Sequence, residues 1–256
     1  MRGVLVFFAV ALAACGSSAK SSVSSSAPAE LSGRLNVFAA ASLTEAFNDE
    51  KSTLATKDRR LSLTYTFAGS QVLVTQIQQG APADVFASAS QKNMKILVDA
   101  GLVETPKTFA RNKLEIAVAP GNPKHITGLA DLEKSGITLV LEDPSVPAGD
   151  YARQAFQKAG LPAPKPASNE LDVKSTLAKL TSGEADAVIV YVSDVKAAGN
   201  KVVGVEIPDS QNVIATYPIA AIKASKHLPA AEAFVDEIVS GTGQQALLAR
   251  GFLPPT

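Results

Sequence analysis

The sequence is poor in the side chains that form disulfides and zinc sites. Its 256 residues include one cysteine, Cys15, and two histidines, His125 and His227. A lone cysteine has no partner for an internal disulfide. Two histidines without a cysteine pair also argue against a structural zinc site, which takes four such ligands. The fold must therefore rest on a packed core.

Charge of either sign is also scarce. The 24 Lys and Arg residues balance the 24 Asp and Glu residues. Charged residues make up 19% of the chain, against a typical ~25%. Without a basic excess or a long charge run, neither nucleic acid nor another polyelectrolyte is an expected partner. Hydrophobic residues make up 46%, which is enough for a core, and the length permits one large domain or two lobes.

The N-terminus carries an apolar run followed by the cysteine. The run at 4–11 is shorter than the roughly 20 residues that span a bilayer, so residues 1–14 are predicted to be a signal peptide. The small residues before Cys15 resemble the lipobox of bacterial lipoproteins, which implies a lipid on Cys15 and an extracytoplasmic protein anchored to the cell membrane. A cleaved signal with an incidental cysteine is the alternative. Residues 15–33, rich in Ser and Ala, are predicted to be a flexible tether.

From Arg34 onward, strand-like apolar runs alternate with helical patterns, which predicts an α/β fold with a mostly parallel sheet. Helical patterns begin at Leu43, Val173 and Ala230, where apolar residues recur at helical spacing. This alternation alone fits either one sheet or two lobes. The expected strands are 34–38, 61–67, 84–88, 114–119, 137–141, 186–191 and 202–207.

Four of the expected helices begin with small or polar residues. The segment at 42–45 (SLTE) is typical of a capping box, and the other three starts are at 69–70 (GS), 147–150 (PAGD) and 169–172 (NELD). Helix N-termini carry unpaired N–H donors and a positive dipole end, and ligands of open α/β sheets bind where such helices begin. The four starts could together bind a small anion, although ordinary capping explains each of them singly.

Several longer strings, taken in order, resemble periplasmic molybdate-binding proteins and cover nearly all of the chain after the tether. They are 37–43 (VFAAASL), 67–70 (FAGS), 76–77 with 80–86 (QI, GAPADVF), 143–149 (DPSVPAG) and 190–194 (VYVSD). The resemblance implies a two-lobed type II periplasmic-binding-protein fold, in which each lobe is a mostly parallel sheet flanked by helices and a hinge joins the lobes. The implied lobes are 34–113 plus 218–256 and 114–217, with crossings near 112–116 and 214–219.

The same resemblance implies a set of neutral donors around an oxyanion. Ser42 and Ser70 would give hydroxyl and backbone N–H donors from one lobe. Ala148 and Val173 would give backbone N–H groups from the other lobe, and Tyr191 would give its phenol O–H. The implied ligand is molybdate or tungstate, held as the anion without direct metal ligands and without a cofactor. Molybdate carries no proton at neutral pH, so a donor-only site favours it over hydrogen phosphate, whereas cavity size must separate it from sulfate.

Two positions depart from the family pattern. Gln71 follows Ser70 where the family often has a second small hydroxyl residue, and Leu171 stands where a carboxylate is common. The basic side chains nearest in sequence to the implied donors, Arg153 and Lys174, are expected on solvated helix faces. The nearby acids are expected to be turn or capping groups: Asp84, Asp150, Asp172 and Asp194.

The implied function is capture of the anion for an ABC importer by a monomeric protein without enzymatic activity, with the permease and ATPase subunits as partners. A binder of sulfate or another oxyanion is an alternative in the same class. A secreted hydrolase is disfavoured, because both histidines lie in polar contexts and Ser70 lacks a Gly-x-Ser-x-Gly elbow. A lipid-anchored adhesion or scaffold domain is the remaining alternative, and it would not respond to a small molecule.

Overall fold

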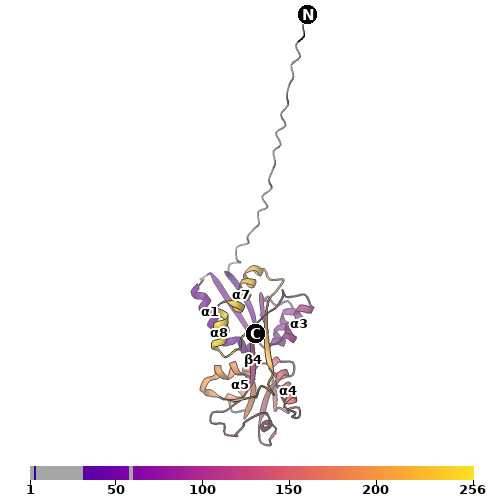
Figure 1. The fold of residues 1–256 in the computed structure, drawn as a ribbon, viewed down its shortest axis with the longest axis vertical. Helices are drawn as coiled ribbons and strands as arrows, with labels where there is room; N and C mark the ends of the chain where they lie inside the picture. The colour runs from indigo at the N-terminus through magenta and orange to yellow at the C-terminus, as the bar shows by residue number, and fades with distance from the viewer. Residues whose placement is uncertain (1–2, 4–30, 58–59) are drawn as a thin grey trace.

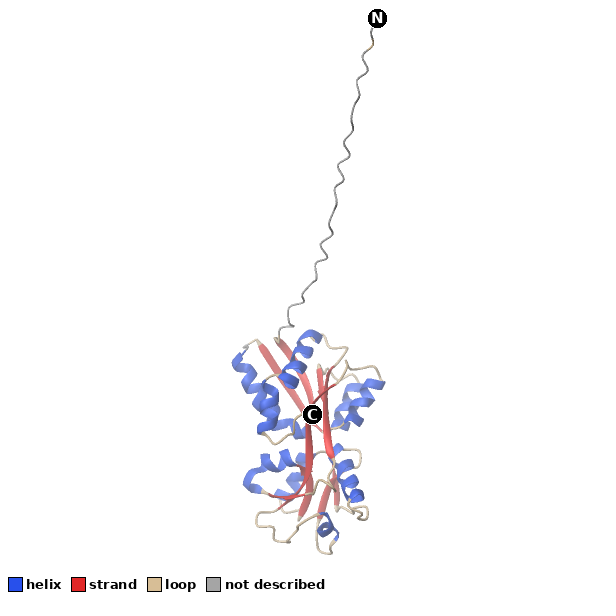
Figure 2. Ribbon diagram, in the orientation of Figure 1, coloured by secondary structure: helices blue, strands red, loops and turns tan. Residues whose placement is uncertain are grey.

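Two groups of strands, each flanked by helices, make up the folded protein (Figures 1 and 2). The computed structural model describes residues 3, 31–57 and 60–256. The predicted signal peptide apart from Gly3, Cys15 and most of the predicted tether lie outside the described residues. Within the described ranges, no helix has the length and apolar run that crossing a bilayer requires.

Strands and helices alternate along most of the chain. The strands are β1 (Gly33–Ala40), β2 (Leu61–Ala68), β3 (Val85–Ala87), β4 (Lys107–Val118), β5 (Leu139–Glu142), β6 (Ser168–Glu170), β7 (Ala187–Tyr191), β8 (Val203–Glu206) and β9 (Ile214–Ala221). The α-helices are α1 (Thr44–Lys57), α2 (Ser70–Gln78), α3 (Gln91–Asp99), α4 (Pro147–Lys158), α5 (Val173–Thr181), α6 (Val192–Ala198), α7 (Leu228–Ser240) and α8 (Thr242–Ala249). The 3-10 helices are η1 (Ala41–Leu43), η2 (Leu129–Glu133) and η3 (Gly199–Lys201).

The first lobe is built around β1, which pairs in parallel with β2 on one side and β3 on the other. Val37 of β1 lies opposite Tyr65 in one ladder and Val85 in the other. The chain passes from β1 to β2 through α1 and from β2 to β3 through α2, because successive parallel strands need a crossover. β9 pairs with β3 in the antiparallel sense. In Figure 1, α1, α3, α7 and α8 surround this group of strands.

The second lobe repeats this plan around β5, which pairs in parallel with β6 and β7. Antiparallel pairing then adds β4 beside β7 and β8 beside β4. Every residue of β7 is buried, as expected of a strand covered on both faces. Figure 1 places α4 and α5 around these strands. The predicted two-lobed α/β fold with mostly parallel sheets is confirmed.

The lobes are joined through β4 and β9. β4 pairs with β9 from Lys107 to Lys113 and with β7 from Leu114 to Val118, so one strand belongs to both groups. The strands therefore form one continuous hydrogen-bonded path across two lobes, which combines the two arrangements that the strand pattern left open. The residue boundaries expected for the lobes, 113/114 and 217/218, fall inside β4 and β9 and stay a prediction.

Two strands were missed by the sequence pattern, and β4 begins earlier than expected. β9 contains Pro218, which has no N–H for a ladder and argues against a central strand. In the structure Pro218 lies opposite Thr108, where the β4–β9 register shifts. β6 is a three-residue strand of polar residues without apolar alternation. The early part of β4 carries Arg111 and Lys113, which interrupt its apolar pattern.

A tight backbone contact fixes the start of α4 against the end of β5. An ideal Cβ on Gly149 would lie 2.2 Å from Asp143 O and 2.5 Å from Glu142 O. Gly149→Ala is therefore expected to lower the free energy of unfolding by about 1–3 kcal/mol through overpacking. This loss runs against the gain of roughly 0.5–1 kcal/mol that alanine normally brings in a helix. Urea unfolding of the variant and the parent measures the difference.

Gly128→Ala is the matched control, because nothing lies within 4 Å of an ideal Cβ there. Its free energy of unfolding should stay within about 0.5 kcal/mol of the parent value. Equal stability of the two alanine variants would show that the start of α4 can move away from β5.

Candidate functional site

A small cavity lies where the two lobes meet. The residues expected to bind an anion all line it: Ser42, Ser70, Ala148, Val173 and Tyr191. The first two come from the first lobe, and the other three come from the starts of α4 and α5 and the end of β7. The cavity volume of about 10 Å³ is far below the roughly 300–1,000 Å³ of pockets that hold drug-sized ligands. The cavity therefore suits a small ligand.

Three of the helices that begin at this cavity have no capping side chain. Ala40, Gly69 and Val146 precede η1, α2 and α4, and none of them makes a side-chain cap hydrogen bond. The first N–H groups of a helix have no partner within the helix. In α4 the first helical residue is Pro147, which has no N–H, so Ala148 carries the first such donor. The cavity is thus bordered by helix ends that lack the usual acceptor.

The fourth helix, α5, is capped, and the cap stops short of its first residue. One carboxylate oxygen of Asp172 accepts from the backbone N–H of Lys174 at 2.8 Å and of Ser175 at 2.9 Å. The N–H of Val173 lies outside this cap. The expected capping role of Asp172 is confirmed, and its carboxylate is committed to α5 although Asp172 also lines the cavity.

The capping box predicted at 42–45 is wrong. Ser42 lies inside η1, which begins one residue earlier, and its hydroxyl oxygen is 3.0 Å from the Tyr217 hydroxyl. Glu45 does not reach back to the helix start, because its carboxylate binds Lys174. The Ser70 hydroxyl has a comparable contact behind it, where its oxygen accepts from the backbone N–H of Ala89 at 3.0 Å.

Tyr191 ends β7 with its ring in the interior. Its hydroxyl is buried and has no hydrogen-bond partner among the residues that the structure describes. The ring lies beside that of Tyr217, with centroids 5.8 Å apart. Burial raises the pKa of Tyr191 well above its usual range, so the phenol keeps its proton. The cavity therefore contains a hydroxyl donor that lacks an acceptor within the described chain.

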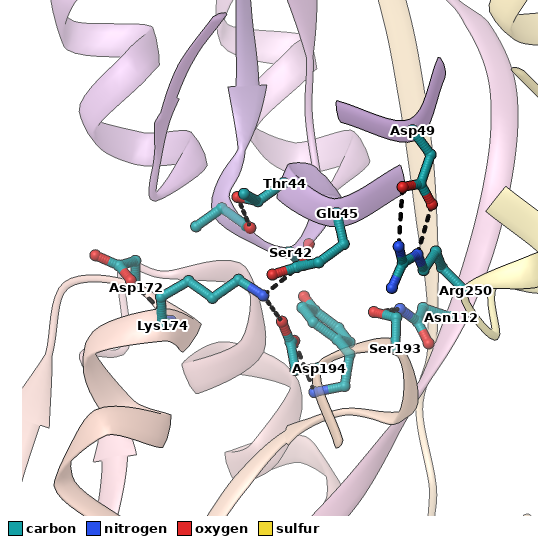
Figure 3. A network of polar contacts seen from close by, with 12 residues as sticks. Ser42, Thr44, Glu45, Asp49, Asn112, Asp172, Lys174, Ser193, Asp194 and Arg250 are labelled. Carbon is teal, nitrogen blue, oxygen red and sulfur yellow. Dashed lines mark hydrogen bonds and ion pairs between the residues drawn. The ribbon is translucent and has the colours of Figure 1, made fainter. Parts of the chain in front are cut away.

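Lys174 does not lie on a solvated helix face, which corrects the sequence expectation. Its ammonium group lies 2.7 Å from Glu45 of α1 and 3.0 Å from Asp194 of α6 (Figure 3). Burial lowers the pKa of Lys174, but the two carboxylates outweigh this effect and the net pKa is raised. The expectation failed because Glu45 lies in the other lobe and is distant in sequence. This ion network closes the junction beside the cavity.

Arg153 is also bound rather than solvated. Its guanidinium donates to the backbone oxygens of Glu142 at 2.9 Å and Gly149 at 2.7 Å, and to the Asn169 side chain at 2.8 Å. The group thus ties α4 to the end of β5 and to β6. These hydrogen bonds hold the first turn of α4, which contains Ala148, in place.

The other acids have structural contacts. The fully buried carboxylate of Asp194 accepts from the Tyr191 N–H at 3.3 Å, which fits the expected capping role. Asp84 accepts from the Asn36 N–H at 2.7 Å and from the Ser225 hydroxyl at 2.5 Å. Asp150 lies in the first turn of α4 and 3.6 Å from Lys92 of the other lobe.

Glu142 is a buried acid that the sequence did not single out. It ends β5, and both carboxyl oxygens lack a hydrogen-bond partner among the described residues. The nearby Thr176 hydroxyl donates to the Asp172 carbonyl instead. Burial raises the pKa of Glu142 to about 8, and the negative charges of Asp194 and Asp172 add to this effect. The position lies in a predominantly apolar strand, which explains why pattern alone gave no signal.

The two residues that depart from the family pattern meet across the cavity rim. The Gln71 amide donates to the Leu171 carbonyl at 3.0 Å, so the first turn of α2 is tied to the other lobe. The backbone of Gly69 also lies close to Leu171, because an ideal Cβ on Gly69 would be 2.3 Å from the same carbonyl oxygen. This contact requires glycine at position 69.

Neither histidine lies at the cavity. His125 and His227 are exposed, as the sequence indicated. Across residues 31–57 and 60–256, no group of His, Cys, Asp and Glu side chains is arranged to hold a metal ion.

The two-lobed fold and the cavity between its lobes are typical of proteins that close around a small solute. The chain belongs to the family of bacterial extracellular solute-binding proteins, whose model matches residues 35–253. The molybdate-binding protein ModA of Mycobacterium tuberculosis is 38% identical over 245 residues, which cover 95% of this chain and 93% of the relative. This membership confirms the family resemblance of the sequence strings.

Two solved structures share the fold at lower identity. The periplasmic molybdate-binding protein of Azotobacter vinelandii matches with a TM-score of 0.75 at 20% identity, over 87% of this chain and all of that one (100%). The sulfate-binding protein SubI of Mycobacterium tuberculosis matches with a TM-score of 0.78 at 20% identity, over 87% of each chain. The type II periplasmic-binding-protein fold is thereby confirmed.

Replacing Glu142 with Gln should change how stability depends on pH. Between the ordinary pKa of 4.5 and the raised pKa of about 8, the folded protein keeps a proton on Glu142 that the unfolded chain releases. The free energy of unfolding of the parent therefore falls as the pH rises through this window. The free energy of unfolding of Glu142→Gln does not fall in this way. Its difference from the parent should therefore grow by several kcal/mol between roughly pH 5 and pH 8, since each pKa unit is worth about 1.4 kcal/mol.

Urea unfolding at the two pH values measures this difference. Glu133→Gln, which changes an exposed glutamate of η2, is the control and should follow the parent at both values. Parallel pH profiles of Glu142→Gln and the parent would mean that the buried carboxyl is already ionised in the folded state.

Proposed function

We propose that this protein captures molybdate, and also tungstate, outside the cytoplasm and delivers the anion to the permease and ATPase subunits of an ABC importer. The observation that carries the proposal is the cavity at the lobe junction, where uncapped helix starts, two serines and the free Tyr191 hydroxyl converge. The name of the 38% identical relative from Mycobacterium tuberculosis supports the choice of anion. The protein acts as a monomer without a cofactor and without enzymatic activity.

The donors fit an anion that carries no proton. Molybdate only accepts hydrogen bonds, so hydroxyl and N–H donors match all of its oxygens. Hydrogen phosphate would place a proton against these donors, and an unmatched buried polar group costs roughly 1–3 kcal/mol. The Asp172 carboxylate could accept such a proton, but it already binds the first turn of α5. The arrangement therefore favours fully deprotonated oxyanions.

Sulfate is the second candidate, because the fold is shared with a sulfate-binding protein. Sulfate has the charge and shape of molybdate and differs in size, so donor chemistry does not separate the two. A hydrolase finds no histidine near Ser42 or Ser70, since both histidines are exposed and away from the cavity. A scaffold domain would leave the buried donors without a purpose.

Thermal unfolding with added anions tests the proposal. Molybdate at 100 times its dissociation constant should raise the free energy of unfolding by about 2.7 kcal/mol, and tungstate should act similarly. Ser42→Ala and Tyr191→Phe each remove a donor to a charged acceptor, so each should weaken molybdate binding roughly tenfold or more. Isothermal titration measures the affinities directly.

Matched controls use the same substitutions away from the cavity. Ser135→Ala changes an exposed serine, and Tyr65→Phe removes a buried hydroxyl that has no partner among the described residues. Both should bind like the parent. A larger response to sulfate than to molybdate would favour the second candidate, and no response to any of these anions would refute the function.

The lipid anchor is tested with Cys15→Ser. The substitution removes the sulfur that would carry the lipid, so the full chain expressed in a bacterial host should move from the membrane fraction to a soluble one. Two or more acyl chains at about 0.8 kcal/mol per buried CH₂ hold a protein on a membrane stably. Ser17→Ala is the control and should stay with the membrane. Recovery of the parent in the soluble fraction, with no added lipid mass on its N-terminal peptide, would contradict the anchor.

A further inference from the structure

The contact between Ser42 and Tyr217 determines where the Ser42 proton can point. Their hydroxyl oxygens are 3.0 Å apart, and both side chains are buried. Each hydroxyl has one proton, and the contact uses only one of them. In one arrangement Tyr217 donates to Ser42 and the Ser42 proton is free for a ligand. In the other arrangement Ser42 donates to Tyr217 and has no proton left for the cavity.

We propose that Tyr217 is a positioning residue: its hydroxyl donates to the Ser42 oxygen and thereby directs the Ser42 proton into the cavity. The proposal rests on the proposed function, because a ligand that only accepts hydrogen bonds selects this arrangement over the other. Tyr217 lies in β9 and does not line the cavity, so it acts through Ser42 and not on the anion.

The Ser70 hydroxyl also has a contact that directs its proton, and here the donor is certain. The group behind its hydroxyl is the backbone N–H of Ala89, which can only donate, at 3.0 Å. The Ser70 oxygen therefore accepts from behind, and its proton has to point elsewhere. Both serines of the first lobe thus have a contact behind the hydroxyl that can leave its proton free for the cavity.

The Tyr217 phenol is held rigidly enough to give its hydrogen bond a fixed direction. Its ring packs edge-on against Phe252 and Phe109, with centroids 5.4 Å and 6.2 Å apart, and 5.8 Å from the ring of Tyr191. Burial raises the pKa of Tyr217 above its usual range, so the donor proton is present at all physiological pH values. The packed ring therefore holds the hydroxyl oxygen in place, 3.0 Å from that of Ser42.

The consequence is selection by the protonation state of the ligand. With Tyr217 in place, the Ser42 oxygen offers its proton to the cavity, and the Tyr217 proton occupies one of its two lone pairs. Without the Tyr217 hydroxyl, both lone pairs of the Ser42 oxygen are free and its proton is no longer directed into the cavity, so Ser42 accepts from a ligand more readily. A tetrahedral dianion that carries one proton would then find an acceptor in the cavity.

Tyr217→Phe tests this role, because the phenylalanine keeps the ring and removes only the hydroxyl. Molybdate is compared with hydrogen arsenate, a tetrahedral dianion that carries one proton. Isothermal titration should show molybdate affinity weakened roughly tenfold. Hydrogen arsenate affinity should stay unchanged or increase, so the preference for molybdate falls. Tyr65→Phe is the control for loss of a buried phenol hydroxyl and should change neither affinity.

A double-mutant cycle with Ser42→Ala separates positioning from packing. If Tyr217 acts through Ser42, Tyr217→Phe should change molybdate affinity by less than about twofold once Ser42 is Ala. If Tyr217 merely supports the core, its substitution should cost the same in both backgrounds and weaken both anions equally, which would overturn the proposal. Where binding by Ser42→Ala falls below detection, the anion preference of Tyr217→Phe alone decides.

The outcomes also separate this inference from the function on which it rests. A parent protein that does not bind molybdate refutes both. A parent that binds molybdate and loses affinity on Ser42→Ala, but keeps its full affinity and preference on Tyr217→Phe, refutes only the positioning role.

Discussion

Buried hydrogen-bond donors need acceptors, and the junction of the two lobes gathers donors whose usual acceptors are missing. Three of the four helices that begin there follow Ala40, Gly69 and Val146, none of which caps with its side chain. The Tyr191 hydroxyl has no partner among the described residues. In the proposed function the anion supplies all of these acceptors at once. Because each lobe holds only part of the donor set, the ligand stabilises the arrangement in which the lobes are together.

In the proposed function, backbone dipoles and not a lysine provide the positive charge for the ligand. The Lys174 ammonium group lies between Glu45 and Asp194, so two carboxylates already neutralise it (Figure 3). Helix N-termini provide partial positive charge without a locked ion pair. The Glu45–Lys174 contact also joins the two lobes. The charged side chains thus form ion pairs at the lobe junction, while neutral groups face the cavity.

Strand and helix patterns were enough to predict an α/β fold, whereas the two lobes and the residues that come together at the cavity were predicted from the resemblance of short strings to a known family. That they bind the anion stays a prediction. The contacts that support them are distant in sequence: Ser42 and Tyr217 are 175 positions apart, and Glu45 and Lys174 are 129 apart. Tyr217 was also hidden because Pro218 obscures β9. Glu142 gave no signal, since its burial follows from packing between distant elements.

The near contact between Gly69 and the Leu171 carbonyl sets how far the lobes can approach each other. An ideal Cβ at position 69 would already lie 2.3 Å from that oxygen, so main chain meets main chain at the rim. Such a stop does not yield in the way that flexible side chains do. The distance between the donors of the two lobes therefore has a minimum value. In the proposed function, an ion too narrow for that distance would gain hydrogen bonds from one lobe only.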